Sequence, residues 1–298
     1  MSLSRRTFLS QAAAAAAWAA APPIRAFAPS TPSTSKKGLA GIAPEKSGLL
    51  TSWYYDWRLY PATTGLPALH PEMQFHPMCW GWRSEAAMQA QAAQQVHPQA
   101  HSDDSTAQGL QALRARKPTV LFGFNEPDQP EQSHLSPEAA IDAWPAFQGI
   151  AQELVSPSCA HPQTDWMETF VSAAERRHLQ LDSLGYHTYP SDSVDAFATQ
   201  LNAFHRKYDR PVWVTEFAVA DWAARDGHTV NRYSVDRVAD FMRGACRFME
   251  DTPWIRGYAW FPRGGKFSTR DRKGPLATSV LFNDDDTLND LGKLYASI

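Results

Sequence analysis

Two glutamates, Glu126 and Glu216, each lie at the end of a short apolar run that is typical of a β-strand. Glu126 lies in the string Asn-Glu-Pro-Asp at 125–128, and Glu216 follows the run at 212–215. Glycoside hydrolysis needs one carboxylic acid to protonate the leaving oxygen and one carboxylate to attack the anomeric carbon. Carboxyl groups about 5–5.5 Å apart give retention of configuration. We therefore predict Glu126 as the acid/base and Glu216 as the nucleophile of a retaining glycoside hydrolase.

The elements that must position these glutamates alternate between short apolar runs and longer helical patterns. The expected strands are residues 49–55, 73–80, 119–124, 154–157, 183–188, 211–215 and 257–261. The expected helices are residues 136–153, 165–178, 193–208 and 234–251. This alternation predicts parallel βαβ units, and hence an α/β fold of the (β/α)8 TIM barrel type. An open doubly wound sheet is the alternative, but no glycine-rich phosphate loop follows an early strand.

The first half of this barrel is expected to be degenerate. Only about 18 residues separate the first two expected strands, which is too few for a crossover helix with its loops. The eighth strand must also lie early in the chain, either at 38–42 or within 97–117. Counting back from Glu216 on the seventh strand then places Glu126 on the fourth strand. The two carboxylates would face each other across the barrel mouth, where the reaction takes place in this fold.

Several strings in the chain resemble one family of glycosidases. They are Leu-Phe-Gly-Phe-Asn-Glu-Pro-Asp at 121–128, Ser-Trp-Tyr-Tyr-Asp-Trp at 52–57, Pro-Met-Cys-Trp-Gly at 77–81, Val-Thr-Glu-Phe-Ala at 214–218 and Leu-Gly-Lys-Leu-Tyr at 291–295. In this order they resemble glycoside hydrolase family 128, within the clan A retaining glycosidases. The resemblance covers nearly all of the chain after the N-terminal segment. It implies a β-1,3-glucanase with a β-glucan oligo- or polysaccharide as substrate. The many aromatic residues, which are spread over several loops, favour an endo-acting enzyme.

The resemblance also implies roles for the residues around the two glutamates. Asn125 would hydrogen-bond the sugar 2-hydroxyl, a contact that strengthens in the transition state. Tyr189 or His187 would orient Glu216, and Trp260 would form the floor under the sugar that is cleaved.

Aromatic residues are further candidates for the sugar-binding subsites, since the chain has 11 tryptophans. Those near the first strands are Trp53, Tyr55, Trp80 and Trp82. Side chains alternate between the two faces of a strand, so not all of these can line one cleft. Core packing remains the alternative for each of them.

The N-terminal segment is expected to be an export signal rather than part of the fold. Residues 4–9 form a twin-arginine pattern, an alanine-rich run follows at 11–21, and Ala-Phe-Ala at 26–28 is typical of a cleavage site. We divide the chain into a signal peptide at 1–28, a polar linker at 29–36 and one barrel domain at 37–298. The apolar run is too short for a stable membrane anchor. Export by the twin-arginine route predicts a periplasmic or secreted protein.

The charge of the exported chain limits its partners. Without residues 1–28 it keeps 25 basic and 31 acidic residues, a formal net charge of −6, which argues against a nucleic-acid partner. We expect a monomer without a cofactor or metal ion. Two alternatives stay open: the same mechanism on another β-linked polysaccharide such as a mannan or galactan, and a non-catalytic carbohydrate-binding barrel. The pair Glu126 and Glu216 argues against the second, since binding alone requires neither.

Overall fold

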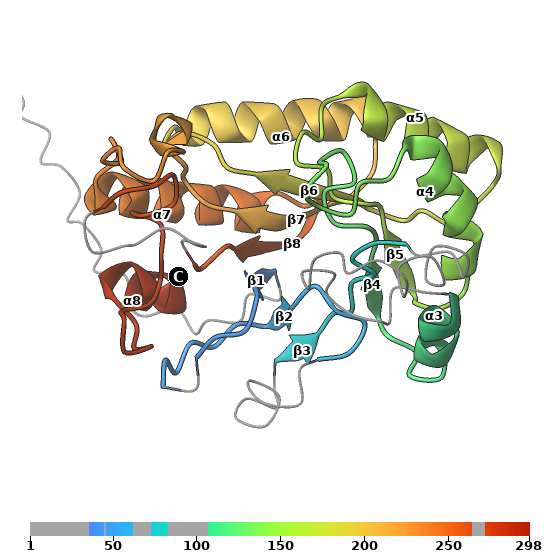
Figure 1. The fold of residues 1–298 in the computed structure, drawn as a ribbon, viewed down its shortest axis with the longest axis horizontal. Coiled ribbons are helices and arrows are strands. Elements are labelled where there is room, and N and C mark those ends of the chain that lie inside the picture. Colours follow the sequence, from blue (N-terminus) through green and yellow to red (C-terminus); the bar gives the residue numbers. More distant parts are fainter. Residues whose placement is uncertain (1–35, 45, 62–72, 83–106, 264–271) are drawn as a thin grey trace, which may run out of the picture. The chain divides into compact units, whose positions relative to one another are not determined.

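The computed structural model describes residues 36–44, 46–61, 73–82, 107–263 and 272–298, and these contain eight β-strands (Figure 1). The strands are β1 Lys37–Ala40, β2 Trp53–Tyr55, β3 Gln74–Phe75, β4 Val120–Phe122, β5 Glu153–Val155, β6 Leu184–Thr188, β7 Val212–Phe217 and β8 Ile255–Trp260. All of them belong to one compact unit, Ser33–Ile298. The expected signal peptide and nearly all of the expected linker lie outside the described residues, so the domain division stays a prediction.

The eight strands form a closed parallel barrel. Hydrogen-bonded neighbours follow the order β3-β2-β1-β8-β7-β6, and β4 pairs with β5, all in parallel. Two isolated parallel bridges close the ring: Met78 with Phe122 next to β3 and β4, and Val155 with Ser183 between β5 and β6. The predicted barrel is therefore confirmed. The early eighth strand is β1, which overlaps the first of the two segments proposed for it, 38–42, and begins one residue earlier.

The described helices are α3 Ala107–Arg114, α4 Pro137–Ala143, α5 Asp165–Arg176, α6 Val194–Tyr208, α7 Val235–Asp251 and α8 Asp290–Ser297. The starts of α4, α6 and α7 follow the sequence closely, because a serine side chain accepts a backbone N–H at each N-cap. Figure 1 shows α4 to α7 flanking β4 to β8, whereas the described residues between β1 and β2 contain no helix. The first half of the barrel is thus irregular, as predicted.

The helix expected at 136–153 is much shorter than predicted. It ends at Ala143 and continues only as the 3-10 helix Trp144–Phe147. Pro145 lacks an N–H, and its ring crowds the carbonyl of Ile141, so an α-helix cannot continue through it. Gly149 then turns the chain at φ 68° toward β5.

Large aromatic side chains fill the barrel interior. Trp53 and Trp213 meet edge to face at 5.1 Å between ring centroids. Glycines make room for them, because a Cβ on Gly38 would lie 2.2 Å from the Trp53 ring and one on Gly257 would lie 2.3 Å from the Trp213 ring. His76 is buried against the same rings. The lower barrel is therefore a packed core, and the cleft must lie above it at the C-terminal strand ends.

Two adjacent lysines fasten the start of β1 to the ends of two helices. The Lys36 Nζ donates to three carbonyls at the end of α7, at 2.8–3.1 Å. The buried Lys37 Nζ donates to the carbonyls of Tyr295, Ala296 and Ile298 at the end of α8, at 2.6–3.3 Å. Both ammonium groups donate to carbonyls in and just after the last turn of a helix, at the negative end of the helix dipole. No helix among the described residues is both long enough and apolar enough to cross a membrane.

Candidate active site

Glu126 lies just beyond β4, where backbone hydrogen bonds from two sides hold it. Its own N–H donates to the Ser158 carbonyl at 2.7 Å, and the N–H of Asn125 donates to the Trp80 carbonyl at 2.8 Å. Glu126 has a positive φ of 41°, a conformation that side chains other than glycine adopt rarely. These flanking bonds maintain that conformation and direct the carboxyl group into the barrel mouth.

Asp128 fixes the neighbouring loop in place. Its carboxylate accepts the backbone N–H groups of Ala160 and His161 at 2.8 and 2.9 Å. The string at 125–128 therefore combines a candidate acid, Glu126, with an anchor for the loop after β5. Sequence reasoning missed this anchoring role of Asp128.

Glu216 is a buried residue of β7 that accepts hydrogen bonds on both carboxylate oxygens. The Tyr55 hydroxyl and the Trp57 indole N–H donate to Oε1 at 3.0 and 2.9 Å. The Tyr189 hydroxyl donates to Oε2. Three donors stabilise negative charge on a carboxylate and fix its orientation, as a nucleophile requires.

The two tyrosines remain donors at any ordinary pH. Burial raises the pKa of the Tyr55 and Tyr189 hydroxyls well above the usual value, and the nearby carboxylates Glu216 and Glu126 raise it further. The predicted contact between Tyr189 and Glu216 is thus present.

His187 lies between the two glutamates at the end of β6. Its Nδ1 is 3.1 Å from Glu126 Oε1, and its Nε2 is 3.6 Å from Glu216 Oε1. A register shift between Tyr186 and His187 places His187 directly beside Glu216 across the β6–β7 pair. Burial lowers the pKa of His187, but the carboxylates around it outweigh this and raise the pKa above its usual value.

The spacing of the two carboxyl groups fits double displacement. One ligand atom from each of Glu126, His187 and Glu216 lies within 4.8 Å of the others, close to the separation in retaining glycosidases. Within the described part of the chain, these three also form the one group of side chains that could hold a metal ion. The oxygens of Glu216 already accept three hydrogen bonds, which favours acid–base and nucleophilic chemistry over metal binding.

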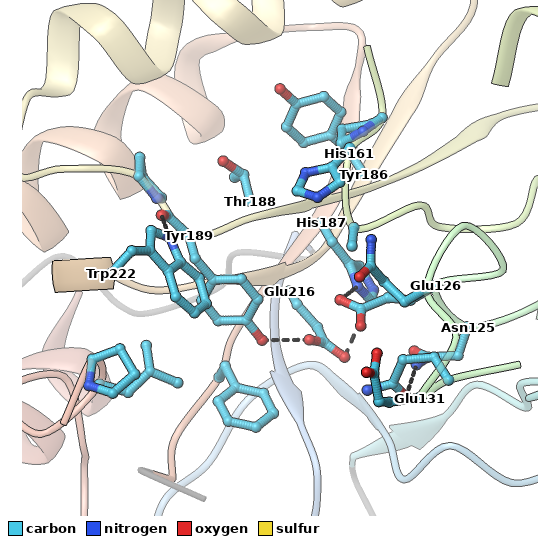
Figure 2. A pocket seen from close by; sticks show the side chains of 18 of the residues that line it. Asn125, Glu126, Glu131, His161, Tyr186, His187, Thr188, Tyr189, Glu216 and Trp222 are labelled. Carbon is cyan, nitrogen blue, oxygen red and sulfur yellow. Dashed lines mark hydrogen bonds and ion pairs between the residues drawn. The ribbon is translucent and has the colours of Figure 1, made fainter. Parts of the chain in front are cut away.

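A cavity of about 910 Å³ opens around this pair. Figure 2 shows Tyr189 and Trp222 on one side of Glu216, and Asn125 and Glu131 on the other side, next to Glu126. The described residues that line it and were predicted from the sequence are Asn125, Glu126, Glu216, His187, Tyr189 and Trp80. The structure therefore brings both predicted glutamates and their predicted polar neighbours into one cleft.

Four of the predicted aromatic residues do not line this cleft. Trp260 is fully buried, and its indole donates to the Ser279 carbonyl at 2.8 Å, so it cannot form the floor under a sugar. Trp53 fills the barrel interior. Trp82 packs against Phe124 on the outer side of the barrel. Tyr55 is fully buried below Glu216 and acts on it by a hydrogen bond, not on the sugar.

Four other described aromatic residues line the cleft and were missed as sugar-binding candidates: Trp57, Tyr186, Trp222 and Phe261. Trp57 could have been predicted, because it is the last residue of the string at 52–57. Its positive φ of 61° turns its side chain toward Glu216. Phe261 is the residue immediately after Trp260, so the aromatic residue that lines the cleft here is one position later than predicted. Trp222 is 47% exposed and begins the short 3-10 helix Trp222–Ala224 after β7, and no periodic pattern marks such a position.

Comparisons with known proteins agree with this geometry. A family model described as "Glycosyl hydrolase catalytic core" matches residues 32–295. A GH128 subgroup I endo-beta-1,3-glucanase from Amycolatopsis mediterranei, solved in complex with laminaritriose, is 28% identical with a TM-score of 0.66, over 88% of this chain and 99% of that chain. A subgroup II endo-beta-1,3-glucanase from Sorangium cellulosum is 24% identical with a TM-score of 0.61, over 88% and 97% of the two chains.

A subgroup V exo-beta-1,3-glucanase from Cryptococcus neoformans has the same fold, at 23% identity and a TM-score of 0.60, over 88% of this chain and 98% of that chain. A search of curated protein sequences finds no significant match. The closed barrel and the paired glutamates at its mouth define a glycoside hydrolase. The chain belongs to the glycosyl hydrolase catalytic core family, and within it to glycoside hydrolase family 128.

Proposed function

We propose that this enzyme hydrolyses β-1,3-glucan inside the chain, with retention of the anomeric configuration. The observation that carries the proposal is the pair Glu126 and Glu216, whose ligand atoms lie within 4.8 Å while three donors hold Glu216. The choice of sugar is supported by the Amycolatopsis enzyme, which is 28% identical and was solved with laminaritriose.

In the first step, a Glu216 oxygen attacks the anomeric carbon as the glycosidic bond breaks. Glu126 transfers its proton to the departing oxygen, so one glucan fragment leaves as an alcohol and the other becomes an ester of Glu216. The His187 Nδ1, 3.1 Å from Glu126, holds the acid in the position from which it can protonate the leaving group.

In the second step, Glu126 is a carboxylate and takes a proton from water. The water oxygen bonds to the anomeric carbon from the side that the first fragment left, and Glu216 departs with the electron pair of the ester bond. Negative charge then returns to the Glu216 oxygens, where Tyr55, Trp57 and Tyr189 donate hydrogen bonds. Two inversions at one carbon give net retention.

Endo action is supported by aromatic residues on both sides of the cleavage point. Trp222 lies beyond Tyr189, with 6.0 Å between the ring centroids. Trp80 lies on the Glu126 side, where its carbonyl accepts the Asn125 N–H. Flat apolar faces of sugars pack on aromatic rings, so a chain that passes through the site would meet a ring in both directions.

The twin-arginine pattern supports a place outside the cytoplasm for this activity. We propose export by that route, followed by action as a monomer in the periplasm or the medium. Replacing Arg5 and Arg6 with lysines should leave activity in the cytoplasmic fraction, and light scattering of the exported form should give one chain per particle. Unchanged export of the double variant would contradict the route.

The central experiment is hydrolysis of laminarin, a soluble β-1,3-glucan, followed by proton NMR of the anomeric signals. Wild type should release β-anomer product first, and Glu126→Gln and Glu216→Gln should lose activity. Glu138→Gln, an exposed change on α4, serves as the control and should behave as wild type. Early α-anomer would contradict retention. No product from wild type would exclude laminarin as a substrate, and mannan and galactan would be tested next.

A further inference from the structure

The side-chain amide of Asn125 makes a hydrogen bond through its nitrogen but none through its oxygen among the described residues. Its Nδ2 donates to the Gln132 Oε1 at 3.2 Å. Its Oδ1 is buried and has no hydrogen-bond partner among the described residues, although Asn125 is only 4% exposed. A buried carbonyl oxygen without a donor is energetically unfavourable. Asn125 lines the cleft beside Glu126, so a hydroxyl of a bound sugar is the donor that this oxygen lacks (Figure 2).

Gln132 is held in a fixed position relative to Asn125 by the backbone between them. The Gln129 N–H donates to the Glu126 carbonyl at 3.0 Å, and the Gln132 N–H donates to the Gln129 carbonyl at 3.1 Å. The Ser133 N–H then returns to the Asn125 carbonyl at 3.3 Å. This loop places the Gln132 side chain where its Oε1 accepts the hydrogen bond from the Asn125 amide.

An asparagine amide can present either its NH₂ group or its oxygen to a ligand, and the two have opposite requirements. The hydrogen bond from Nδ2 to Gln132 Oε1 fixes the rotation of the Asn125 amide, and Oδ1 is then the atom of this amide that is buried without a partner among the described residues. We propose that Gln132 is a positioning residue that fixes the Asn125 amide in this orientation. Asn125 then accepts a hydrogen bond from a hydroxyl of the sugar at the cleavage site, the 2-hydroxyl in the pattern of the clan. This inference rests on the proposed function for its choice of sugar.

The arrangement gives Gln132, which also lines the cleft, an effect on specificity through the Asn125 amide. If the 2-hydroxyl contact strengthens in the transition state, its loss lowers kcat/KM for any substrate that carries that hydroxyl. A substrate without the hydroxyl cannot benefit from the oriented amide. Replacing Gln132 should therefore reduce the ratio of kcat/KM for the substrate with the 2-hydroxyl to kcat/KM for the substrate without it. A general loss of folding would lower both values of kcat/KM by the same factor.

The kinetic test compares two aryl β-laminaribiosides, one complete and one lacking the 2-hydroxyl on the ring that is cleaved. In wild type the complete substrate should have a kcat/KM higher by about 30-fold or more, given a transition-state contact of several kcal/mol. Gln132→Met, which fills the space without an acceptor, should reduce this ratio at least fivefold. Gln132→Glu keeps an acceptor oxygen, and its ratio should stay within twofold of wild type. Gln111→Met, an exposed change on α3, is the control.

Two kinetic results would overturn the proposal. An unchanged ratio in Gln132→Met would show that Gln132 does not orient the amide. An equal collapse in Gln132→Glu and Gln132→Met would show that Asn125 presents its NH₂ group to the sugar instead.

A second measurement does not depend on any substrate and separates this proposal from the proposed function. In enzyme labelled with ¹⁵N-asparagine, the Asn125 side-chain NH₂ signal can be assigned as the one missing in Asn125→Asp. One of its two proton shifts should move upfield in Gln132→Met and remain in place in Gln132→Glu. If wild type cleaves neither glucoside nor laminarin, the proposed substrate fails while this result still decides the role of Gln132. An unmoved signal in Gln132→Met would refute that role.

Discussion

Removing the Tyr189 hydroxyl should slow the second step of the reaction more than the first. The two oxygens of Glu216 are not equally supported. Oε1 receives hydrogen bonds from Tyr55 and Trp57, whereas Oε2 receives one only from Tyr189 among the described residues. Tyr189→Phe therefore leaves an oxygen without a protein donor, and Tyr55→Phe leaves Trp57 on the other oxygen.

The size of the effect follows from the charge on Glu216. In the second step the ester breaks and Glu216 departs as a carboxylate, so a donor at its oxygen stabilises the developing charge. A hydrogen bond to a charged group contributes about 1.5–3 kcal/mol, which corresponds to roughly 10- to 150-fold in rate. We expect Tyr189→Phe near the upper end, about 100-fold, and Tyr55→Phe near the lower end, about 10-fold.

The assay uses a dinitrophenyl β-laminarioside, whose good leaving group makes the first step fast. Tyr189→Phe should show a burst of dinitrophenol equal to the enzyme concentration, a kcat lower by about 100-fold, and a lower KM because the ester accumulates. Tyr60→Phe, whose hydroxyl donates to the Gly109 carbonyl outside the cleft, is the control and should match wild type. A fall in kcat with no burst and an unchanged KM would refute the reasoning, as would equal losses in Tyr189→Phe and Tyr55→Phe.

Three further changes test the support of the barrel. Burial lowers the pKa of His76 to about 3, so its stabilising effect is complete above the unfolded value near 6.5 and is lost toward pH 3. As the pH falls through that window, the free energy of unfolding of wild type, measured with urea, should decrease by about 1.4 kcal/mol per pH unit more than that of His76→Phe. An equal decrease with pH in the two proteins would contradict this. Asp128→Ala leaves two loop N–H groups unpaired and should lower stability by about 1–3 kcal/mol, seen as a lower Tm; an unchanged Tm would refute the anchoring role. Lys37→Met should lower Tm similarly, and an unchanged Tm would show that its three carbonyl contacts contribute nothing.

The strand order and the two glutamates could be predicted because they depend on local patterns. Apolar runs of four to six residues ending in a glutamate mark β4 and β7, and serine caps mark the helix starts at α4, α6 and α7. The prediction was less accurate for short strands, because a few residues show too little apolar periodicity to identify a strand. β3 has two residues and β1 has four, and β1 consists of the mixed residues Lys-Gly-Leu-Ala. The early end of α4 depends on Pro145, because the apolar periodicity continues past this residue while the α-helix does not.

The cleft walls could be predicted less well, since side-chain direction depends on details that periodicity does not contain. Trp53 and Tyr55 both belong to β2, and the turn after β2, not the strand itself, brings Trp57 to Glu216. Trp260 points outward from β8 to the core behind it, with the ring of Phe217 4.9 Å away. The next residue, Phe261, lines the cleft. A one-residue difference in direction at a strand end decides which aromatic ring a sugar can reach.

The pairing of β1 with β8 has a consequence for how fast the barrel forms and opens. Gly38 pairs with Ala259, and the Lys36 and Lys37 ammonium groups hold residues of α7 and α8 that are more than 200 positions away in the chain. Contacts between residues so far apart in the sequence are expected to form late in folding, because the chain between them must be ordered first. A junction absent from the folding transition state affects mainly the unfolding rate. The two lysines should therefore slow unfolding and have little effect on the folding rate. They would determine the lifetime of the folded enzyme.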